Sequence, residues 1–251
     1  MRRGLAGIVA LGALLMSLSG CAESASSADE ETVTVFAAAS LSEVFEDLAA
    51  EFESEHDGVS VRFNFAGSSD LVSQLTEGAS ADVLATADES TMQDAVDAGL
   101  VDGAPLPFAT NTLTIAVPAG NPAGIESFTD LASPQARVVV CAAQVPCGAA
   151  AALVQEAAGI ALSPVSEELS VTDVLGKVTS GEADAGLVYK TDVIRAGDDV
   201  EEIPIDEAAS VVNRYPIAAT PAASETAAAF IEFVLDSRGQ QLLADAGFGA
   251  A

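Results

Sequence analysis

The stretch "VTVFAAASLSEVFEDL", from Val33 to Leu48, changes character at its centre. Its first half has the β-branched and apolar residues of a buried strand, and its second half has the apolar spacing of an amphipathic helix. Three alanines and Ser40 lie between the two halves. This turn holds no charge, no histidine and no glycine-rich loop, although ligands of α/β proteins commonly bind at such turns.

Strand-like and helix-like segments alternate along the rest of the chain. The predicted strands are Val33–Ala37, Val59–Phe65, Val83–Thr86, Leu113–Val117, Arg137–Cys141, Ala185–Tyr189 and Val211–Ala218. The predicted helices are Leu41–Glu55, Ser69–Glu77, Thr91–Ala98, Gly148–Ala158, Thr172–Ser180 and Ser224–Ala246. This alternation predicts an α/β fold with mixed, mostly parallel sheets flanked by helices.

Two segments break the alternation and predict crossovers between two lobes. Phe108–Gly124 is a strand followed by turn-forming residues, and Val211–Thr220 is a lone strand before the last helix. We expect residues 32–112 and 213–251 to form the first lobe and residues 113–212 the second, with a hinge at the crossovers. A single larger sheet is the alternative.

The N-terminus has the features of an export signal. Arg2 and Arg3 precede an apolar run, Leu5 to Leu18, which is short for a transmembrane helix. The next residues, up to Cys21, resemble the lipobox of bacterial lipoproteins, which predicts residues 1–20 as a signal peptide and Cys21 as the lipid attachment site. Plain secretion and a retained membrane anchor are the alternatives. Residues 21–31 are predicted to be a flexible acidic tether.

Cys141 and Cys147 remain after Cys21 is assigned. Outside the membrane, where disulfides persist, a short-loop disulfide is the favoured reading. Metal binding is the rival, although two thiols without a nearby histidine make a poor zinc site.

Acidic residues dominate the charge, with 38 Asp and Glu against 9 Lys and Arg and a formal net charge of −29. This balance argues against nucleic acid and anionic membrane surfaces as partners. It also repels anions at long range, although salt screens exposed charges within about 8 Å.

Four strand-to-helix turns share one character: they are small, neutral and rich in hydrogen-bond donors. They contain Ser40, then Gly67-Ser68-Ser69, then Cys147-Gly148, and finally Thr172 or Asp173 as a helix cap. Each turn offers free backbone N–H groups at the positive end of a helix. Together they suit an anion that is held by neutral hydrogen bonds, although each one alone reads as an ordinary helix cap.

The segments "VTVFAAASL", "FAGSSDL" and "SGEADAGLVYKTDV" resemble the periplasmic molybdate-binding proteins that feed ABC transporters. The resemblance implies a two-lobed type II periplasmic-binding-protein fold that holds molybdate or tungstate between its lobes, with no cofactor and no catalysis. It implies a monomer outside the cytoplasm, anchored to the membrane by its lipid, which delivers the oxyanion to an ABC permease.

The resemblance also implies a ligand-binding set without metal-cation ligands. The hydroxyls and amides of Ser40 and Ser68 come from one lobe, with Ser69 as the alternative register for the second serine. The backbone amides of Cys147 and Val174 and the hydroxyl of Tyr189 come from the other lobe. In the family an alanine often stands where this chain has Cys147, and the disulfide could stiffen that turn.

Asp70 departs from the neutral residue that the family leads us to expect. An aspartate in the first helical turn is favourable for the helix dipole, which is the structural reading. The functional reading is that Asp70 accepts a proton from an anion such as hydrogen phosphate.

Other polar residues are interpreted as structural. His56 is expected in an exposed turn, Glu182 and Asp184 at a helix end, Lys190 facing away from Tyr189, and Arg214 at most near the cleft mouth. The rival functions are a binding protein for sulfate or phosphate, a small enzyme such as a dehydratase, and the sensing domain of a regulator. A dehydratase needs an acid or base in the cleft, and none of the four turns clearly supplies one.

Overall fold

The computed structural model describes residues 31–251. The predicted signal peptide, the predicted lipid attachment site Cys21 and the predicted tether up to residue 30 therefore lie outside the described residues. Glu31, the last residue of the expected tether, is already the first residue of strand β1 and pairs with Val59. Within residues 31–251, no helix is both long and apolar enough to cross a membrane.

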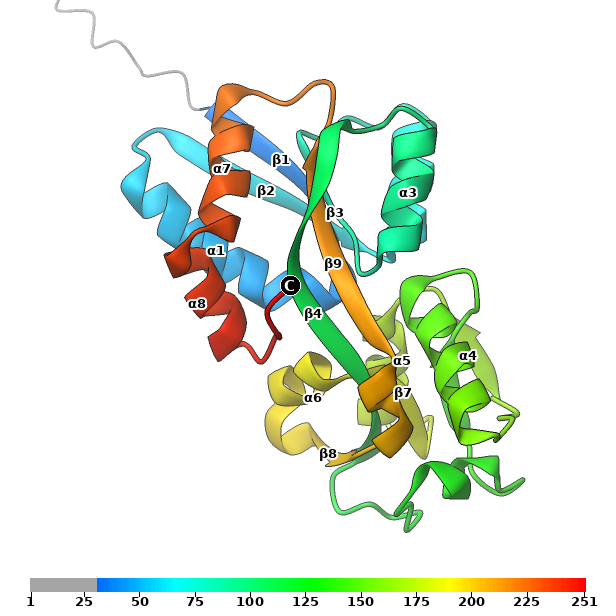
Figure 1. The fold of residues 1–251 in the computed structure, drawn as a ribbon. Coiled ribbons are helices and arrows are strands. Elements are labelled where there is room, and N and C mark those ends of the chain that lie inside the picture. The colour runs from blue at the N-terminus through cyan, green and yellow to red at the C-terminus, as the bar shows by residue number, and fades with distance from the viewer. Residues whose placement is uncertain (1–30) are drawn as a thin grey trace, which may run out of the picture.

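The first group of strands is built around β1 (Glu31–Ala38). It runs parallel to β2 (Val59–Ala66) on one side and to β3 (Val83–Ala85) on the other. The antiparallel strand β9 (Val212–Ala219) follows β3. Figure 1 shows these strands in the upper part of the molecule.

The helices of this part cover both faces of its strands. One face is covered by α1 (Ser42–Glu55), α7 (Glu225–Leu235) and α8 (Ser237–Asp245), and the other by α2 (Ser68–Thr76) and α3 (Glu89–Asp97). Side chains alternate along β1, so that Val33 and Val35 face the first layer and Phe36 faces the second. Both faces of this strand are buried, which explains its nearly continuous apolar sequence.

The second group of strands is built around β5 (Val138–Cys141). It runs parallel to β6 (Ser166–Glu168) and to β7 (Ala185–Tyr189), and β7 pairs antiparallel with β4 (Asp102–Pro118). A short strand, β8 (Val200–Ile203), also pairs with β4. The helices here are α4 (Pro146–Ala158), α5 (Val171–Thr179) and α6 (Lys190–Ala196). Short 3₁₀ turns η1 to η4 lie at Ala39–Leu41, Phe128–Ala132, Gly197–Asp199 and Asp206–Ser210.

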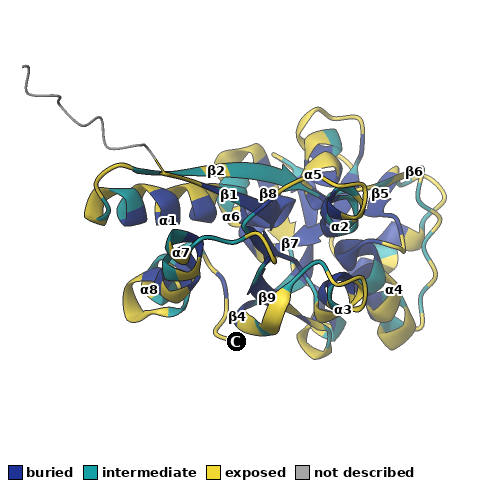
Figure 2. Cartoon of the chain, turned by 90° about the horizontal axis from the view of Figure 1, so that it is seen from above, coloured by how far each residue is buried: buried dark blue, intermediate teal, exposed yellow. Residues whose placement is uncertain are grey.

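Strands β4 and β9 connect the two parts and pair with each other. The first half of β4 pairs with β9, and its last residues, from Leu113 on, pair with β7 and β8. The hydrogen-bonded ladder is therefore continuous through β4. The hydrophobic cores are nevertheless separate. One is made of residues between Leu113 and Ala208, and the others are made of residues 33–109 and 215–248. In Figure 2 the buried residues lie on the inner strands and on the inward faces of the helices.

Several elements differ from the sequence-based expectations. The predicted helix Ser224–Ala246 is interrupted at Asp236, which is extended and caps α8 by accepting from the amides of Arg238 and Gly239. Strand β4 is much longer than Leu113–Val117, and β6 and β8 were not predicted. Lys190 begins α6 instead of continuing a strand.

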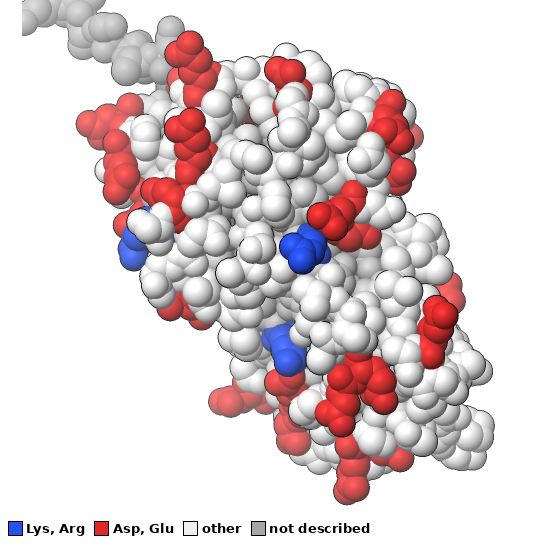
Figure 3. Space-filling model, viewed as in Figure 1, with Lys and Arg blue, Asp and Glu red and all other residues white. Residues whose placement is uncertain are grey.

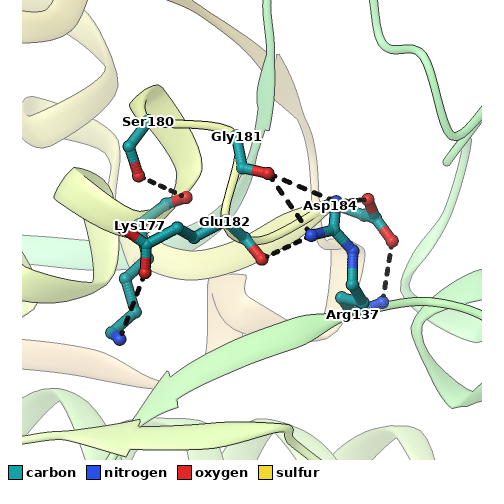
Figure 4. Close-up of polar contacts among 6 residues, drawn as sticks. All are labelled: Arg137, Lys177, Ser180, Gly181, Glu182 and Asp184. Atoms are coloured by element: carbon teal, nitrogen blue, oxygen red, sulfur yellow. Dashed lines mark hydrogen bonds and ion pairs between the residues drawn. The ribbon is translucent and has the colours of Figure 1, made fainter.

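Glu182 and Asp184 have structural contacts, as interpreted from the sequence. The guanidinium of Arg137 donates to Asp184 Oδ1 at 2.6 Å and to the carbonyl oxygen of Glu182 at 2.7 Å. Figure 4 shows this cluster at the start of β5 and β7. It holds together the N-terminal ends of β5 and β7. The strand-to-helix turns extend from the opposite, C-terminal ends of these strands.

Candidate functional site

A small cavity lies where the strand-to-helix turns of the two parts of the molecule meet. Its volume is about 20 Å³, a little above the roughly 10–15 Å³ that one bound water needs, so it suits a compact ligand. It is lined by Ala38, Ala39, Ser40, Gly67, Ser68, Ala87, Val145, Pro146, Cys147, Leu169, Ser170, Val171 and Tyr189. Four of the five residues expected to bind the ligand are in this set.

Ser68 is the first residue of α2 and is buried. Its Oγ accepts a hydrogen bond from the backbone N–H of Ala87 at 3.0 Å. Because a hydroxyl carries one proton of its own, this bond leaves the Ser68 proton free to be donated into the cavity. Ser69 instead donates to the carbonyl oxygen of Gln144 at 2.9 Å, and it does not line the cavity.

Ser40 lies in the 3₁₀ turn between β1 and α1 and is also buried. The sequence predicted it as a helix cap, but α1 begins at Ser42 and has no side-chain cap. The Ser40 hydroxyl instead lies 3.1 Å from the hydroxyl of Tyr215 on β9.

Cys147 is in the first turn of α4, after Pro146. Proline suits this position because the first amides of a helix have no partner inside it. Among residues 31–251, the first backbone bonds of this turn start at Gly148 and Ala149, which leaves the Cys147 amide free to donate. Cys141 and Cys147 form a disulfide, which ties the end of β5 to the start of α4.

The remaining amide was expected at Val174, which lies outside the cavity lining. Helix α5 begins at Val171, with Ser170 as its cap, so neither Thr172 nor Asp173 caps it. The Val174 amide donates to the carbonyl oxygen of Ser170 at 3.3 Å, and Val174 does not line the cavity. The residue of this helix start that does line it is Val171, three positions earlier, because the cap of the helix is Ser170 and not Thr172 or Asp173.

Tyr189 ends β7 and is almost fully buried. Within the described residues, its hydroxyl has no hydrogen-bond partner. Burial raises the pKa of this hydroxyl well above its usual value, and Tyr215 and Asp88 add to the shift. The group therefore stays protonated and can donate a hydrogen bond into the cavity.

Asp192 lies behind the cavity and does not line it. It is fully buried, accepts from the Tyr189 amide at 3.0 Å and pairs with Arg195 at 3.2 Å. Burial raises the pKa of its carboxyl to about 6, against the opposing effect of Arg195.

All the residues that line the cavity are neutral. Acidic side chains instead lie on the outer surface, and on the face shown in Figure 3 they are scattered in separate groups, one of them beside a basic side chain near the middle. Among residues 31–251, no group of three or more His, Cys, Asp or Glu side chains is placed to hold a metal ion. The cavity therefore offers hydroxyl and amide donors without a counter-charge, which is chemistry for an anion held by hydrogen bonds.

The remaining sequence candidates lie elsewhere. Asp70 lines a wider depression of about 320 Å³ beside the cavity, together with Ser42, Thr172 and Asp173. His56 is half-buried, not exposed as expected, and stacks on Phe52 at the end of α1. Arg214 lines a separate depression with Asp88 and Glu89. Tyr215 and Ala87, which contact the two serines, were not identified from the sequence, because Tyr215 lies in a strand far along the chain from Ser40 and Ala87 contributes only its backbone N–H.

Comparison of the sequence with known proteins identifies a family and a similar protein of assigned function. Residues 33–249 match the model of a family described as bacterial extracellular solute-binding protein. The molybdate-binding protein ModA of Mycobacterium tuberculosis is 49% identical over 219 residues, which cover 86% of this chain and 84% of that protein.

Two solved structures show the same fold. The periplasmic molybdate-binding protein of Azotobacter vinelandii superposes with a TM-score of 0.75 at 20% identity, covering 87% of this chain and 99% of that one. The sulfate-binding protein SubI of Mycobacterium tuberculosis gives a TM-score of 0.71 at 23% identity, covering 88% and 87%. This confirms the two-lobed α/β architecture expected from the sequence.

Proposed function

Since this chain belongs to the bacterial extracellular solute-binding proteins, we propose that it binds molybdate between its two lobes and delivers it to an ABC importer. The observation that carries the proposal is a compact cavity with a neutral lining, into which the buried Tyr189 hydroxyl, which has no hydrogen-bond partner among residues 31–251, is available to donate. Such donors stabilise a bound dianion through charge-assisted hydrogen bonds. The 49% identity to a molybdate-binding relative supports the choice of anion.

The proposed ligand donors are the hydroxyls of Ser40, Ser68 and Tyr189 and the amides of Cys147 and Val171. Val171 takes the place first assigned to Val174, because the Val174 amide is already bonded to Ser170. The donors come from both sides of the pair β4 and β9, which supports lobes at residues 32–112 with 213–251 and at residues 113–212. Closure of the lobes at these two strands would bring the donors around the anion.

The finer parts of the proposal follow from ligand chemistry and from the N-terminal sequence. Tungstate has the charge and shape of molybdate, so the same donors would bind it. The lipobox-like residues before Cys21 support a monomeric lipoprotein that is anchored outside the cytoplasm by its lipid. In this role the protein binds and releases its ligand without changing it, so we do not propose an enzyme.

Sulfate is the second candidate, because it also needs only donors and because the cavity volume is small. Phosphate is disfavoured, since at neutral pH it carries a proton that requires an acceptor, and the carboxylates of Asp70 and Asp173 line the neighbouring depression and not the cavity.

The test is the thermal midpoint of the purified protein with molybdate, tungstate, sulfate or phosphate. Ligand at a hundred times its Kd adds about 2.7 kcal/mol of stability, which shifts the midpoint by several degrees. A rise with molybdate and tungstate that exceeds any rise with sulfate supports the proposal. A larger rise with sulfate would replace the ligand, a rise with phosphate would make Asp70 a ligand, and no rise with any anion would contradict an oxyanion site.

A further inference from the structure

Tyr215 contacts the site from the crossover strand β9 without lining the cavity. Its side chain is fully buried, and its hydroxyl lies within hydrogen-bond distance of Ser40 Oγ, at 3.1 Å. Its ring packs edge-on against the ring of Tyr189, with centroids 6.0 Å apart. Tyr215 therefore contacts one proposed donor from each lobe.

The direction of the proton between Tyr215 and Ser40 follows from the partners that each group has. Burial raises the pKa of Tyr215 well above its usual value, so its hydroxyl keeps a proton to donate. If Ser40 donated to Tyr215 instead, the Tyr215 proton would be buried without an acceptor, which is costly. When Tyr215 donates, the Ser40 proton is left to point into the cavity.

Ser68 is arranged in the same way by a different group. The N–H of Ala87 donates to Ser68 Oγ at 3.0 Å, and an amide cannot reverse its role. Both serine hydroxyls thus accept a hydrogen bond from the surrounding protein and keep their own proton to donate. Of the two groups that donate to these serines, the Ala87 N–H and the Tyr215 hydroxyl, only the Tyr215 hydroxyl can be removed by a side-chain substitution.

We propose that Tyr215 is a positioning residue that fixes the Ser40 hydroxyl as a donor and thereby makes the site reject protonated oxyanions. The inference rests on the proposed function and deepens it by naming what sets the specificity. A fully deprotonated anion such as molybdate or sulfate accepts from every donor. Hydrogen phosphate carries a proton that would meet the Ser40 proton, unless that hydroxyl is free to turn.

The experiment compares wild type, Tyr215→Phe and Thr114→Val at pH 8. Titration calorimetry gives the Kd of each protein for sodium molybdate, sulfate and phosphate. Sulfate and phosphate are close in size, so their comparison separates the effect of the proton from any change in cavity size. Thr114 is the matched control, since it is a buried hydroxyl of crossover strand β4 that donates to Glu202 and Ile203, away from the cavity.

Tyr215→Phe is expected to bind molybdate about tenfold more weakly, equal to about 1.4 kcal/mol, and to gain phosphate binding relative to sulfate by a similar factor. Thr114→Val should leave both quantities unchanged. If Tyr215→Phe and wild type have the same ratio of phosphate affinity to sulfate affinity, the inference is overturned while the proposed function stands. Wild type that binds none of the deprotonated anions overturns the proposed function itself.

Ser40→Ala is a second variant that tests the same inference, and it can be used even if Tyr215→Phe does not fold. This variant has no hydroxyl to turn, so it should lose molybdate affinity without gaining phosphate relative to sulfate. A phosphate gain in Ser40→Ala would mean that loosening of the cavity explains selectivity, and it would overturn the role of Tyr215.

Discussion

The carbonyl oxygen of Leu169 occupies the space that a β-carbon on Gly67 would need. Gly67 precedes α2 in the first lobe, and Leu169 lies between β6 and α5 in the second. Glycine is needed here for close approach and not for an unusual backbone, since its φ is −58° and its ψ is 137°. The contact between the two lobes beside the cavity therefore depends on the absence of one methyl group.

Gly67→Ala is expected to weaken molybdate binding roughly 10- to 100-fold, because overpacking typically costs about 1–3 kcal/mol. The lobes can relieve the clash by separating, so the penalty falls on the closed, ligand-binding arrangement and not on folding. Titration calorimetry and the thermal midpoint without ligand measure the two effects separately.

Gly176→Ala is the matched control for this prediction. Gly176 lies inside α5, and an added β-carbon there meets nothing within 4 Å. This change should leave affinity unaltered and stabilise the protein by about 0.5–1 kcal/mol. Wild-type affinity in Gly67→Ala would show that the lobes do not need this contact to bind the ligand.

Tyr189→Phe separates ligand binding from folding in a different way. Its hydroxyl has no protein partner within the described residues, so its removal should not lower the free energy of unfolding without ligand. It should raise the Kd for molybdate about 10- to 100-fold, since a hydrogen bond to a charged group contributes about 1.5–3 kcal/mol. Equal affinity in Tyr189→Phe and wild type would remove Tyr189 from the proposed ligand set.

Much of the fold was predictable because inner strands such as β1, β5 and β7 are buried on both faces. Strands such as β1 and β5 are then short apolar runs, and the helices between them keep their apolar stripes. The strands that were missed, β6 and β8, are short and polar, with sequences Ser-Glu-Glu and Val-Glu-Glu-Ile. Their pairing is decided by neighbouring strands, which no local pattern reveals.

The residues of the cavity were predictable where they lie at or just after the end of a recognisable strand, as Ser40, Ser68 and Tyr189 do. Val171 was not expected in the cavity lining, and Val174 was chosen instead, because two possible caps, Ser170 and Thr172, precede the same helix. The choice of Ser170 depends on its bonds with Asp173. Tyr215 was invisible to sequence reasoning, since 175 residues separate it from Ser40.

The buried carboxyl of Asp192 predicts a pH dependence of stability. Its pKa is raised from 3.8 to about 6 by burial, so the folded state binds more protons than the unfolded state between these values. Its contribution to stability is therefore full below about pH 4 and falls as the pH rises through 6. The loss approaches at most about 3 kcal/mol for a shift of this size.

Asp192→Asn isolates this effect. Urea unfolding of the variant and of wild type, from pH 4 to pH 8, should show the variant gaining stability relative to wild type as the pH rises. Asp184→Asn is a control of opposite sign, because the hydrogen bond from Arg137 lowers the pKa of Asp184. A difference between Asp192→Asn and wild type that does not change with pH would contradict the shift.

Val171→Pro tests the corrected position of the last amide donor. Proline lacks an N–H but is tolerated at the first position of a helix, which Val171 occupies in α5. Ser170, with φ −140° and ψ 155°, already has the extended backbone that a residue before proline prefers. The variant should fold and bind molybdate about 10- to 100-fold more weakly, because it lacks one donor to a charged ligand.

Val171→Ala is the control for this last change, since it shortens the same buried side chain and keeps the amide. Val174→Pro is the contrasting variant, because it removes the bond to Ser170 inside the helix and should destabilise folding by about 3 kcal/mol. Calorimetric Kd values and thermal midpoints distinguish these effects. If the Val174 amide were the ligand donor, Val171→Pro would bind molybdate as tightly as Val171→Ala does, and the correction would be wrong.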